Sequence, residues 1–481
     1  MNLVEDLLRQ RQIKLLMYNL INFPAEFKNI ISRAFAVDDG KRFLLFVIYI
    51  AVNFIVLTNA ILHNPFIGYD VPEHLKNIQF LASLSWPDPS QSEEFFSPPL
   101  PYVLPALTYG TLILFTDYRQ IALPIACKIA QIGNLCLSLG LTLLLLRLCE
   151  EYRPKCKLLK IATLLLLGIL PVYYKTFSQV RPEPYVAFFF VLSTYIILRI
   201  TSKEVTYSKQ LILGISLGLL ILSRQWGFFL LVCTTIFFIR RSLLDRNKRI
   251  YYIKSVIFSM FWALLVGGWF YGYLYFHYGR ITAFNRSPAS TFAFSNQPLD
   301  FYFGLSPSKL FSSPIRPNFA NQLIPIIYSE TWGDYWGYFL ADKHNLKQAP
   351  VDFLARLNIF GLFPTFLLLG AYLAGLLSLI KKSLSPDNSI SKEVVFLLSL
   401  IVTICMIGYG WFLIRYPSLG KGDTLKATYL IYIFPFLCLL AADLVRKISL
   451  ISPSIKIIVF SVLFLVGIHN LPGLISRRWW F

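Results

Sequence analysis

The sequence predicts an all-α protein that crosses a membrane many times, and three observations lead to this fold class. Of the 481 residues, 56% are hydrophobic and only 15% are charged, whereas soluble domains average about 45–50% apolar and about 25% charged residues. Apolar runs of roughly 20 residues, each long enough to cross about 30 Å of hydrocarbon, recur along the chain. The basic residues concentrate in alternate loops between these runs, which is typical of polytopic membrane proteins.

We predict about eleven membrane-spanning helices, divided into two groups by a long polar loop. Residues 1–42 are expected to form an amphipathic cytoplasmic segment, residues 43–278 a transmembrane catalytic core, residues 279–356 the long outer loop, and residues 357–481 the C-terminal helices. The fifth and sixth spans form a tight hairpin that turns at 223–226. The predicted spans are 43–62, 121–146, 158–173, 185–198, 211–222, 227–239, 255–276, 359–380, 394–413, 428–445 and 457–468.

The distribution of positive charge predicts the orientation of these spans. The chain has a formal net charge of +20, and its basic residues cluster in loops such as 147–157 and 240–249. Such loops normally face the cytoplasm. The N-terminus is therefore predicted to be cytoplasmic, and the loops 63–120 and 277–356 to lie outside the plasma (inner) membrane. The charge is expected to face anionic lipid, and nucleic acid is not an expected partner.

The first outer loop, residues 63–120, follows directly after the first span and is hydrophilic. Pro72 and the helix formers after it predict a short helix over 71–84. The weaker apolar run 101–115 predicts a second outer-face helix that lies along the membrane. Counting this run as a span would invert every later loop and place the basic loops outside.

Asp70, Glu73 and His74 are candidate catalytic residues because one helical turn brings them to one side of the predicted helix. Two interpretations fit Asp70, and the sequence leaves both open. Asp70 is a natural N-cap for the helix. A carboxylate partly shielded at the membrane surface is also suited to act as a general base. The prolines in 97–102 then predict a rigid connector that holds this helix in place.

Three basic residues stand at the outer ends of predicted spans. Arg181 lies in the turn before the fourth span, Arg224 closes the hairpin of the fifth and sixth spans, and Lys426 precedes the tenth span. Such side chains either reach lipid headgroups or bind a phosphate, for which the planar guanidinium fork is well suited. The sequence alone leaves both interpretations open for these three residues.

The long outer loop contains tryptophans interleaved with acids and glycine. Trp332, Asp334 and Trp336 suit a sugar-binding surface, where rings stack on pyranose faces and carboxylates accept hydrogen bonds from hydroxyl groups. The same pattern suits anchoring at the membrane interface. Glu183 and Tyr429 are further candidates for contact with a sugar or an acceptor.

Together these features resemble the GT-C superfamily of integral-membrane glycosyltransferases, which includes protein O-mannosyltransferases, the aminoarabinose transferase of lipid A and lipopolysaccharide-core glycosyltransferases. The first outer loop matches the family's D-x-P-x-H pattern with Asp70, Pro72 and His74, and the S-P-P-L-P-Y turn follows at 97–102. One position departs from the family, which usually has a second acid directly after the first. That position is Val71 here, which argues against a metal-bridging acidic pair and favours Asp70 as the sole base.

Two weaker matches follow, an R-P-E-P turn at 181–184 and the segment of Lys426 and Tyr429 before a late span. The resemblance implies an inverting transfer of a sugar from a polyprenyl-phosphate donor to an acceptor hydroxyl at the outer face of the membrane. The acceptor is a lipid, a glycan or a protein.

In that reaction Asp70 would take the proton of the acceptor hydroxyl, and Arg181, Arg224 and Lys426 would neutralise the departing lipid phosphate. The sequence requires no cofactor and assigns no metal ligand, although a divalent metal is compatible with this chemistry.

Two other functions compete with a glycosyltransferase. A transporter or flippase of a lipid-linked sugar normally places polar groups at the bilayer midplane, often in repeated halves, whereas the acids and arginines here gather at the outer ends of the spans. A polysaccharide ligase or polymerase would share the donor chemistry and use the long loop 279–356.

Overall fold

The computed structural model describes residues 28–37, 42–115, 119–202, 207–282, 289–382, 390–418 and 422–480. Within these residues it is helical without strands, and a single isolated bridge joins His63 to Trp479. The predicted all-α membrane fold is therefore confirmed. The predicted amphipathic segment 1–42 falls largely outside the described residues.

In the described part of the chain, nine helical stretches are long and apolar enough to cross a membrane, or ten if a bent pair counts as one span. Each of the eleven predicted spans coincides with a helix, but α9 (Tyr207–Ile221) has only 15 residues, so the predicted number of eleven is not confirmed. The helices of the nine stretches are α2 (Arg42–Leu62), α5 (Arg119–Tyr152), α8 (Glu183–Ser202), α10 (Phe228–Leu244), α11 (Arg249–Tyr278), α15 (Val351–Lys382), α16 (Ile390–Arg415), α17 (Phe434–Ser449) and α18 (Pro453–Asn470).

The bent pair is the predicted third span, which breaks into α6 (Lys157–Gly168) and α7 (Pro171–Ser178) at an angle of 64°. Pro171 explains the break, because proline has no N–H to continue the helix and disfavours helical geometry in the residue before it. Leu170 is accordingly extended, with φ −87° and ψ 108°. The break turns α7 toward one end of the bundle, where it carries Lys175 into a buried site.

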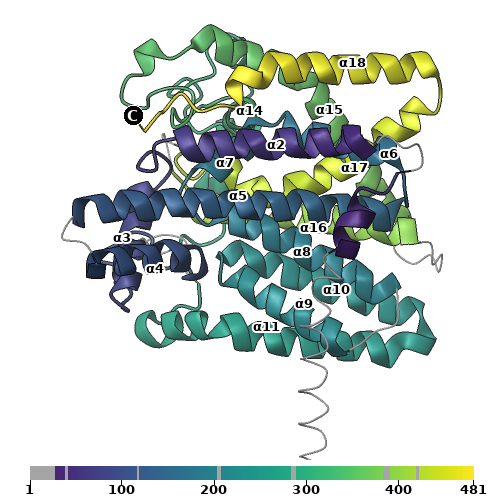
Figure 1. The fold of residues 1–481 in the computed structure, drawn as a ribbon, viewed down its shortest axis with the longest axis horizontal. Helices are drawn as coiled ribbons and strands as arrows, with labels where there is room; N and C mark the ends of the chain where they lie inside the picture. The colour runs from purple at the N-terminus through teal and green to yellow at the C-terminus, as the bar shows by residue number, and fades with distance from the viewer. Residues whose placement is uncertain are drawn as a thin grey trace, which may run out of the picture.

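The long helices run in roughly one direction, and α3 (Val71–Ala82) and α4 (Leu100–Phe115) lie at the same end as the C-terminus (Figure 1). The helix predicted over 71–84 is thus present and ends two residues earlier.

The long loop 279–356 also contains short helices rather than only irregular chain. The remaining elements are α12 (Leu299–Phe303), α13 (Pro307–Leu310), α14 (Leu323–Trp332), η1 (Gln225–Gly227), η2 (Arg246–Lys248), η3 (Phe294–Asn296), η4 (Leu346–Gln348), η5 (Ala427–Ile433) and η6 (Leu471–Gly473).

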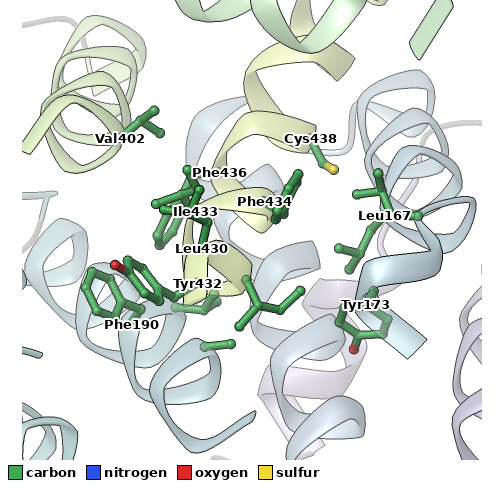
Figure 2. Packing of buried hydrophobic residues seen from close by; sticks show 14 of the residues in the cluster. Leu167, Tyr173, Phe190, Val402, Leu430, Tyr432, Ile433, Phe434, Phe436 and Cys438 are labelled. Atoms are coloured by element: carbon green, nitrogen blue, oxygen red, sulfur yellow. The ribbon is translucent and has the colours of Figure 1, made fainter. Parts of the chain in front are cut away.

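The centre of the bundle is the stretch formed by η5 and α17, 89% of which is buried. In Figure 2, Tyr432 stacks on Phe190, with ring centroids 4.6 Å apart, and Leu430, Ile433 and Phe436 pack around them. Burial of these large apolar side chains fixes the position of η5. Because Lys426 directly precedes η5, this packing also fixes where the lysine lies.

The end of the chain docks against the end of α2. Asn59 Nδ2 donates to Leu474 O at 2.8 Å, and its Oδ1 accepts from Ser476 N–H at 2.8 Å. Trp480 N–H donates to Leu62 O at 2.9 Å. These bonds hold the point at which the chain leaves α2 and enters the first loop.

Candidate active site

A cavity of about 610 Å³ opens at the end of the bundle that holds the first loop. Its walls come from three segments that are distant in sequence. The first loop supplies an acidic wall, the loop between α11 and α15 supplies aromatic and basic side chains, and the segment after α16 closes the third side. The lining residues are Tyr69, Asp70, Glu73, Glu93, Glu94, Phe96, Ser290, Arg316, Trp336, Tyr338, Phe412, Arg415, Tyr416, Pro417, Ser418, Asp423, Thr424, Lys426 and Tyr429.

Asp70 stands at the start of α3 but does not cap it with its side chain. Its φ of 56° is in the left-handed region, and no side-chain capping bond forms. Its backbone carbonyl instead accepts from the N–H of Glu73 and His74, at 3.0 and 3.1 Å. Asp is one of the few residues that tolerate this conformation, which tends to occur at functional sites. The capping interpretation is therefore wrong for the side chain, which is left to face the cavity.

The carboxylate of Asp70 forms an ion pair with Lys426, with Oδ2 2.5 Å from Nζ. Burial alone would raise the pKa of Asp70, but the charge and hydrogen bond of Lys426, with smaller contributions from His74 and Arg181, hold this pKa well below its usual range. Burial would likewise lower the pKa of Lys426, and Asp70 reverses the effect and raises it. Both shifts favour the charged forms of the two side chains.

The three predicted phosphate-binding residues converge on one aromatic ring. The centroid of the Tyr429 ring is 5.3 Å from Lys426 Nζ, 5.7 Å from the guanidinium carbon of Arg181 and 6.0 Å from that of Arg224. Segments separated by more than 200 positions in sequence thus meet at a single point. Of the three cations, only Lys426 lines the cavity.

Arg181 and Arg224 lie behind Tyr429, and each is matched with a buried acid. Arg181 is 3% exposed and pairs with Glu183, which is fully buried. Arg224 is 4% exposed and forms a two-pronged pair with Glu94, at 2.7 and 3.2 Å. Each of the two arginines thus has a carboxylate partner beside the Tyr429 ring, and this ion pair fixes the position of its guanidinium group.

Two cavity cations were missed by the sequence analysis. The Arg316 guanidinium lies 5.1 Å from the Trp336 ring centroid and 3.8 Å from Asp423 Oδ1. Arg415, at the end of α16, has a buried Nε with no hydrogen-bond partner among the described residues. Both lie in segments predicted to face outward. Arg415 was missed because a basic residue at a helix end usually marks only the membrane boundary.

The other predicted catalytic residues divide between the cavity and the core. Glu73 lines the cavity, and its carboxylate accepts from Lys76 Nζ and from Glu93 N–H, each at 2.8 Å. His74 is only 1% exposed and lies 2.8 Å from the Tyr102 hydroxyl. Burial lowers the pKa of His74. Glu73 therefore shares a cavity with Asp70, whereas His74 supports α3 from behind.

Of the predicted sugar contacts, Trp336 and Tyr429 line the cavity, and the other three are buried elsewhere. Trp332 is 1% exposed and donates to Thr365 Oγ1 at 2.8 Å. The fully buried Asp334 accepts hydrogen bonds from four backbone amides, those of residues 338–341. Asp334 thus shapes the loop that presents Tyr338 to the cavity.

A buried cluster of charges ties the first loop to the core, and sequence reasoning did not detect it. Lys175 and Glu330 form an ion pair, and both side chains are fully buried. Lys175 Nζ also donates to Gly333 O at 3.1 Å, and the Tyr69 hydroxyl donates to the Glu330 carboxylate. Burial raises the pKa of Glu330. The residue before Asp70 is therefore held by a polar anchor from α7 and α14.

No cluster of three or more His, Cys, Asp or Glu side chains suited to a metal ion occurs among the described residues.

We expect His63, at the junction of α2 and the first loop, to make the stability of the fold depend on pH. Its Nδ1 lies 2.8 Å from Ser476 Oγ and its Nε2 2.9 Å from Ile67 O. Burial, with a smaller contribution from Lys128, lowers the pKa of His63 from 6.5 to about 4. The unfolded chain therefore binds the proton first, and stability falls as the pH drops from 6.5 toward 4. We expect the loss to reach up to about 1.4 kcal/mol per pH unit.

Thermal unfolding of the wild type and of His63→Gln between pH 7.5 and 4.5 measures this contribution. The difference in stability between the two proteins should shrink as the pH falls. Parallel pH profiles would show that His63 is not the group responsible.

No family model matches the sequence, and no curated protein matches it. Among solved structures, the oligosaccharyltransferase AglB of Archaeoglobus fulgidus, in complex with an inhibitory peptide and a dolichol phosphate, has a TM-score of 0.51 at 13% identity over 91% of this chain. ArnT of Cupriavidus metallidurans bound to undecaprenyl phosphate has a TM-score of 0.49 at 13% identity, also over 91% of this chain.

This chain spans 57% of the length of the AglB structure and 65% of that of ArnT. Both proteins are GT-C membrane glycosyltransferases. At this level of identity the likeness to AglB establishes the fold alone. The predicted GT-C-type fold is therefore confirmed, and the chain is a multi-pass integral membrane protein.

Proposed function

We propose that this protein is an inverting glycosyltransferase that moves a sugar from a polyprenyl-phosphate donor to an acceptor hydroxyl. The observation that carries the proposal is the Asp70–Lys426 ion pair on the wall of a cavity of about 610 Å³. In the proposed reaction Asp70 is the general base and Lys426 is the cation that receives the leaving phosphate, and both side chains line one cavity. The dolichol phosphate in the AglB complex supports a lipid-phosphate donor for a chain of this fold.

The ion pair suggests how the base becomes active. Lys426 keeps Asp70 ionised and donates a hydrogen bond to its Oδ2. A donor phosphate that enters the cavity competes for the lysine, and Asp70 is released toward the acceptor. Its pKa then rises toward the range in which a carboxylate takes a proton effectively.

The proposed reaction is a single displacement at the anomeric carbon of the donor sugar. The acceptor oxygen attacks the anomeric carbon as Asp70 takes its proton, and the bond from that carbon to the phosphate oxygen breaks on the opposite face, so the configuration inverts. The lipid phosphate leaves with the bonding electrons. Lys426, Arg316 and Arg415 stabilise its charge, while Arg181 and Arg224 hold the Tyr429 wall. A divalent metal bound with the donor is compatible with this scheme.

The proposed location of the site is the outer face of the plasma membrane, because the basic loops lie at the other end of the bundle and are expected to face the cytoplasm. The acceptor is a lipid, a glycan or a protein that carries a free hydroxyl. The aromatic side chains of Trp336 and Tyr338 on the cavity wall suit stacking against a sugar ring.

Replacing Lys426 by Gln should raise the donor KM by about 10–100-fold, because a charge-assisted hydrogen bond to the phosphate is lost. Initial rates of transfer at varied concentrations of polyprenyl-phosphate sugar measure the change. Lys309→Gln, in the long loop and outside the cavity, is the control and should leave KM unaltered. An unchanged KM in Lys426→Gln would remove the lysine from the donor site.

Reconstituted vesicles separate a transferase from a transporter or flippase. With donor present, the proposed enzyme cleaves the bond between sugar and phosphate and releases the polyprenyl phosphate. A flippase would move the donor between leaflets with this bond intact, and that result would contradict the proposal. A ligase or polymerase would instead attach a preassembled polysaccharide to the acceptor or extend it by repeat units.

A further inference from the structure

The backbone that carries Lys426 into the cavity is held by side chains from two other segments. Tyr409, on α16, contacts this backbone twice, because its hydroxyl donates to Thr424 O and accepts from Lys426 N–H, each at 3.1 Å. The indole N–H of Trp336, in the long loop, donates to Leu425 O at 3.0 Å. Three successive residues that end at the lysine are therefore tied to α16 and to the long loop.

The core fixes Tyr409 itself. Its side chain is 2% exposed, and its ring contacts those of Trp226 and Phe412, with centroids 6.4 and 6.2 Å apart. The neighbouring Gly408 allows α16 to approach α10 closely, since a Cβ on this glycine would lie 2.2 Å from the ring of Phe229. The position of the Tyr409 hydroxyl is therefore set by the packing of the helices, and the loop before η5 is bonded to it.

The position of this backbone decides where the Lys426 ammonium group lies. A lysine side chain is a flexible four-carbon stem, so a shift at its base changes what its end can reach. Lys426 Nζ contacts Asp70 Oδ2 at 2.5 Å and lies 5.3 Å from the centroid of the Tyr429 ring. Residues 424–426 lie in no helix or strand, whereas a group that binds a substrate must be held to within about 0.5 Å. The hydrogen bonds to Tyr409 provide this precision.

We infer that Tyr409 is a positioning residue for donor binding, and that its hydroxyl holds Lys426 where the ammonium group meets the phosphate of the polyprenyl-phosphate donor. The inference rests on the proposed function, since it takes the lysine as a contact of that phosphate. Thr424 and Lys426 line the cavity, whereas Tyr409 is not among the residues of its wall. Tyr409 therefore acts through the lysine and makes no contact of its own with the donor.

Binding of undecaprenyl phosphate to the full-length protein, measured by native mass spectrometry, tests the inference without knowledge of the sugar. Tyr409→Phe keeps the buried ring and removes both hydrogen bonds. It should raise the Kd by about 3–10-fold, the effect of about one net hydrogen bond, and by less than Lys426→Gln does, because the lysine is still present. Tyr372→Phe is the matched control. It removes a hydroxyl that bonds to Thr403 Oγ1 at 3.1 Å between α15 and α16, outside the cavity, and should bind as the wild type does.

A double-variant cycle separates positioning from a purely structural role. If Tyr409 acts through Lys426, then Tyr409→Phe should add nothing once the lysine is absent, and the double variant should have the same Kd as Lys426→Gln. Independent effects would multiply, and that result would overturn the inference. An unchanged Kd in Tyr409→Phe, alongside a raised Kd in Lys426→Gln, would overturn it as well and leave the proposed donor site standing. An unchanged Kd in Lys426→Gln would remove the lysine from the donor site, and the proposed function and this inference would then fall together.

Hydrogen–deuterium exchange at the Lys426 amide, resolved with overlapping peptides, tests the hydrogen bond itself. In the wild type this amide should exchange slowly, because it donates to a buried hydroxyl. Exchange should be faster in Tyr409→Phe and unchanged in Tyr372→Phe. Rapid exchange in the wild type would overturn the inference even if Tyr409→Phe did not fold.

Discussion

Asp70→Asn is expected to lower the rate of sugar transfer by about 10²–10⁴-fold, the usual contribution of a general base. Asparagine keeps the size of the side chain and still accepts a hydrogen bond from Lys426, but it does not take a proton. The donor phosphate contacts remain, so the donor KM should change little. Initial rates with purified protein, together with its yield in the membrane and its unfolding temperature, measure the effect on catalysis apart from folding.

Glu73→Gln is the matched control, because Glu73 lines the same cavity but its carboxylate is engaged by Lys76 and by the Glu93 amide. This variant should retain activity within a few-fold of the wild type. Full activity in Asp70→Asn would rule out Asp70 as the base. An equal loss in both variants would show that the cavity needs its negative charge in general rather than one proton acceptor.

Lys175→Met is expected to destabilise the protein by about 3–5 kcal/mol, because it leaves the fully buried Glu330 without its ion-pair partner. Glu330 also accepts from the Tyr69 hydroxyl, so the disturbance should reach the first loop and reduce activity as well. Denaturant unfolding in a fixed detergent measures the loss of stability. The double variant Lys175→Met/Glu330→Gln should recover much of it, since the buried charge is then removed from both partners.

Lys76→Gln provides the comparison at the surface. Lys76 pairs with Glu73 at 2.8 Å and is 43% exposed, and such exposed pairs contribute less than about 1 kcal/mol. If Lys175→Met cost no more than Lys76→Gln, or if the double variant were less stable than the single one, the buried pair would not be the anchor inferred here.

The sequence was sufficient to predict the fold class and the helices that underlie all eleven predicted spans. Patterns of hydrophobicity and charge are properties of short stretches of sequence, so they predict the positions of individual helices well. These local patterns did not predict that the chain bends sharply at Pro171. A proline between two apolar runs is also compatible with a modest kink in one continuous helix. The number of complete spans therefore depends on geometry that local patterns do not contain.

The candidate site was only partly predictable, because it is formed by contacts between residues that are distant in sequence. Asp70 and Lys426 were each selected separately, but their ion pair joins positions 356 residues apart. Arg181 and Arg224 were expected to face a phosphate, and only the fold shows that Glu183 and Glu94 already neutralise them. Lys175 lies in an apolar run, and the neighbouring sequence did not indicate that its ion-pair partner lies in α14.

The structure of a complex with a polyprenyl phosphate tests the central claim most directly. The account predicts the phosphate in the cavity of the candidate active site, with an oxygen about 3 Å from Lys426 Nζ and the bond between this lysine and Asp70 broken. A phosphate bound elsewhere, with the Asp70–Lys426 pair intact, would contradict the assignment of this cavity as the site of sugar transfer.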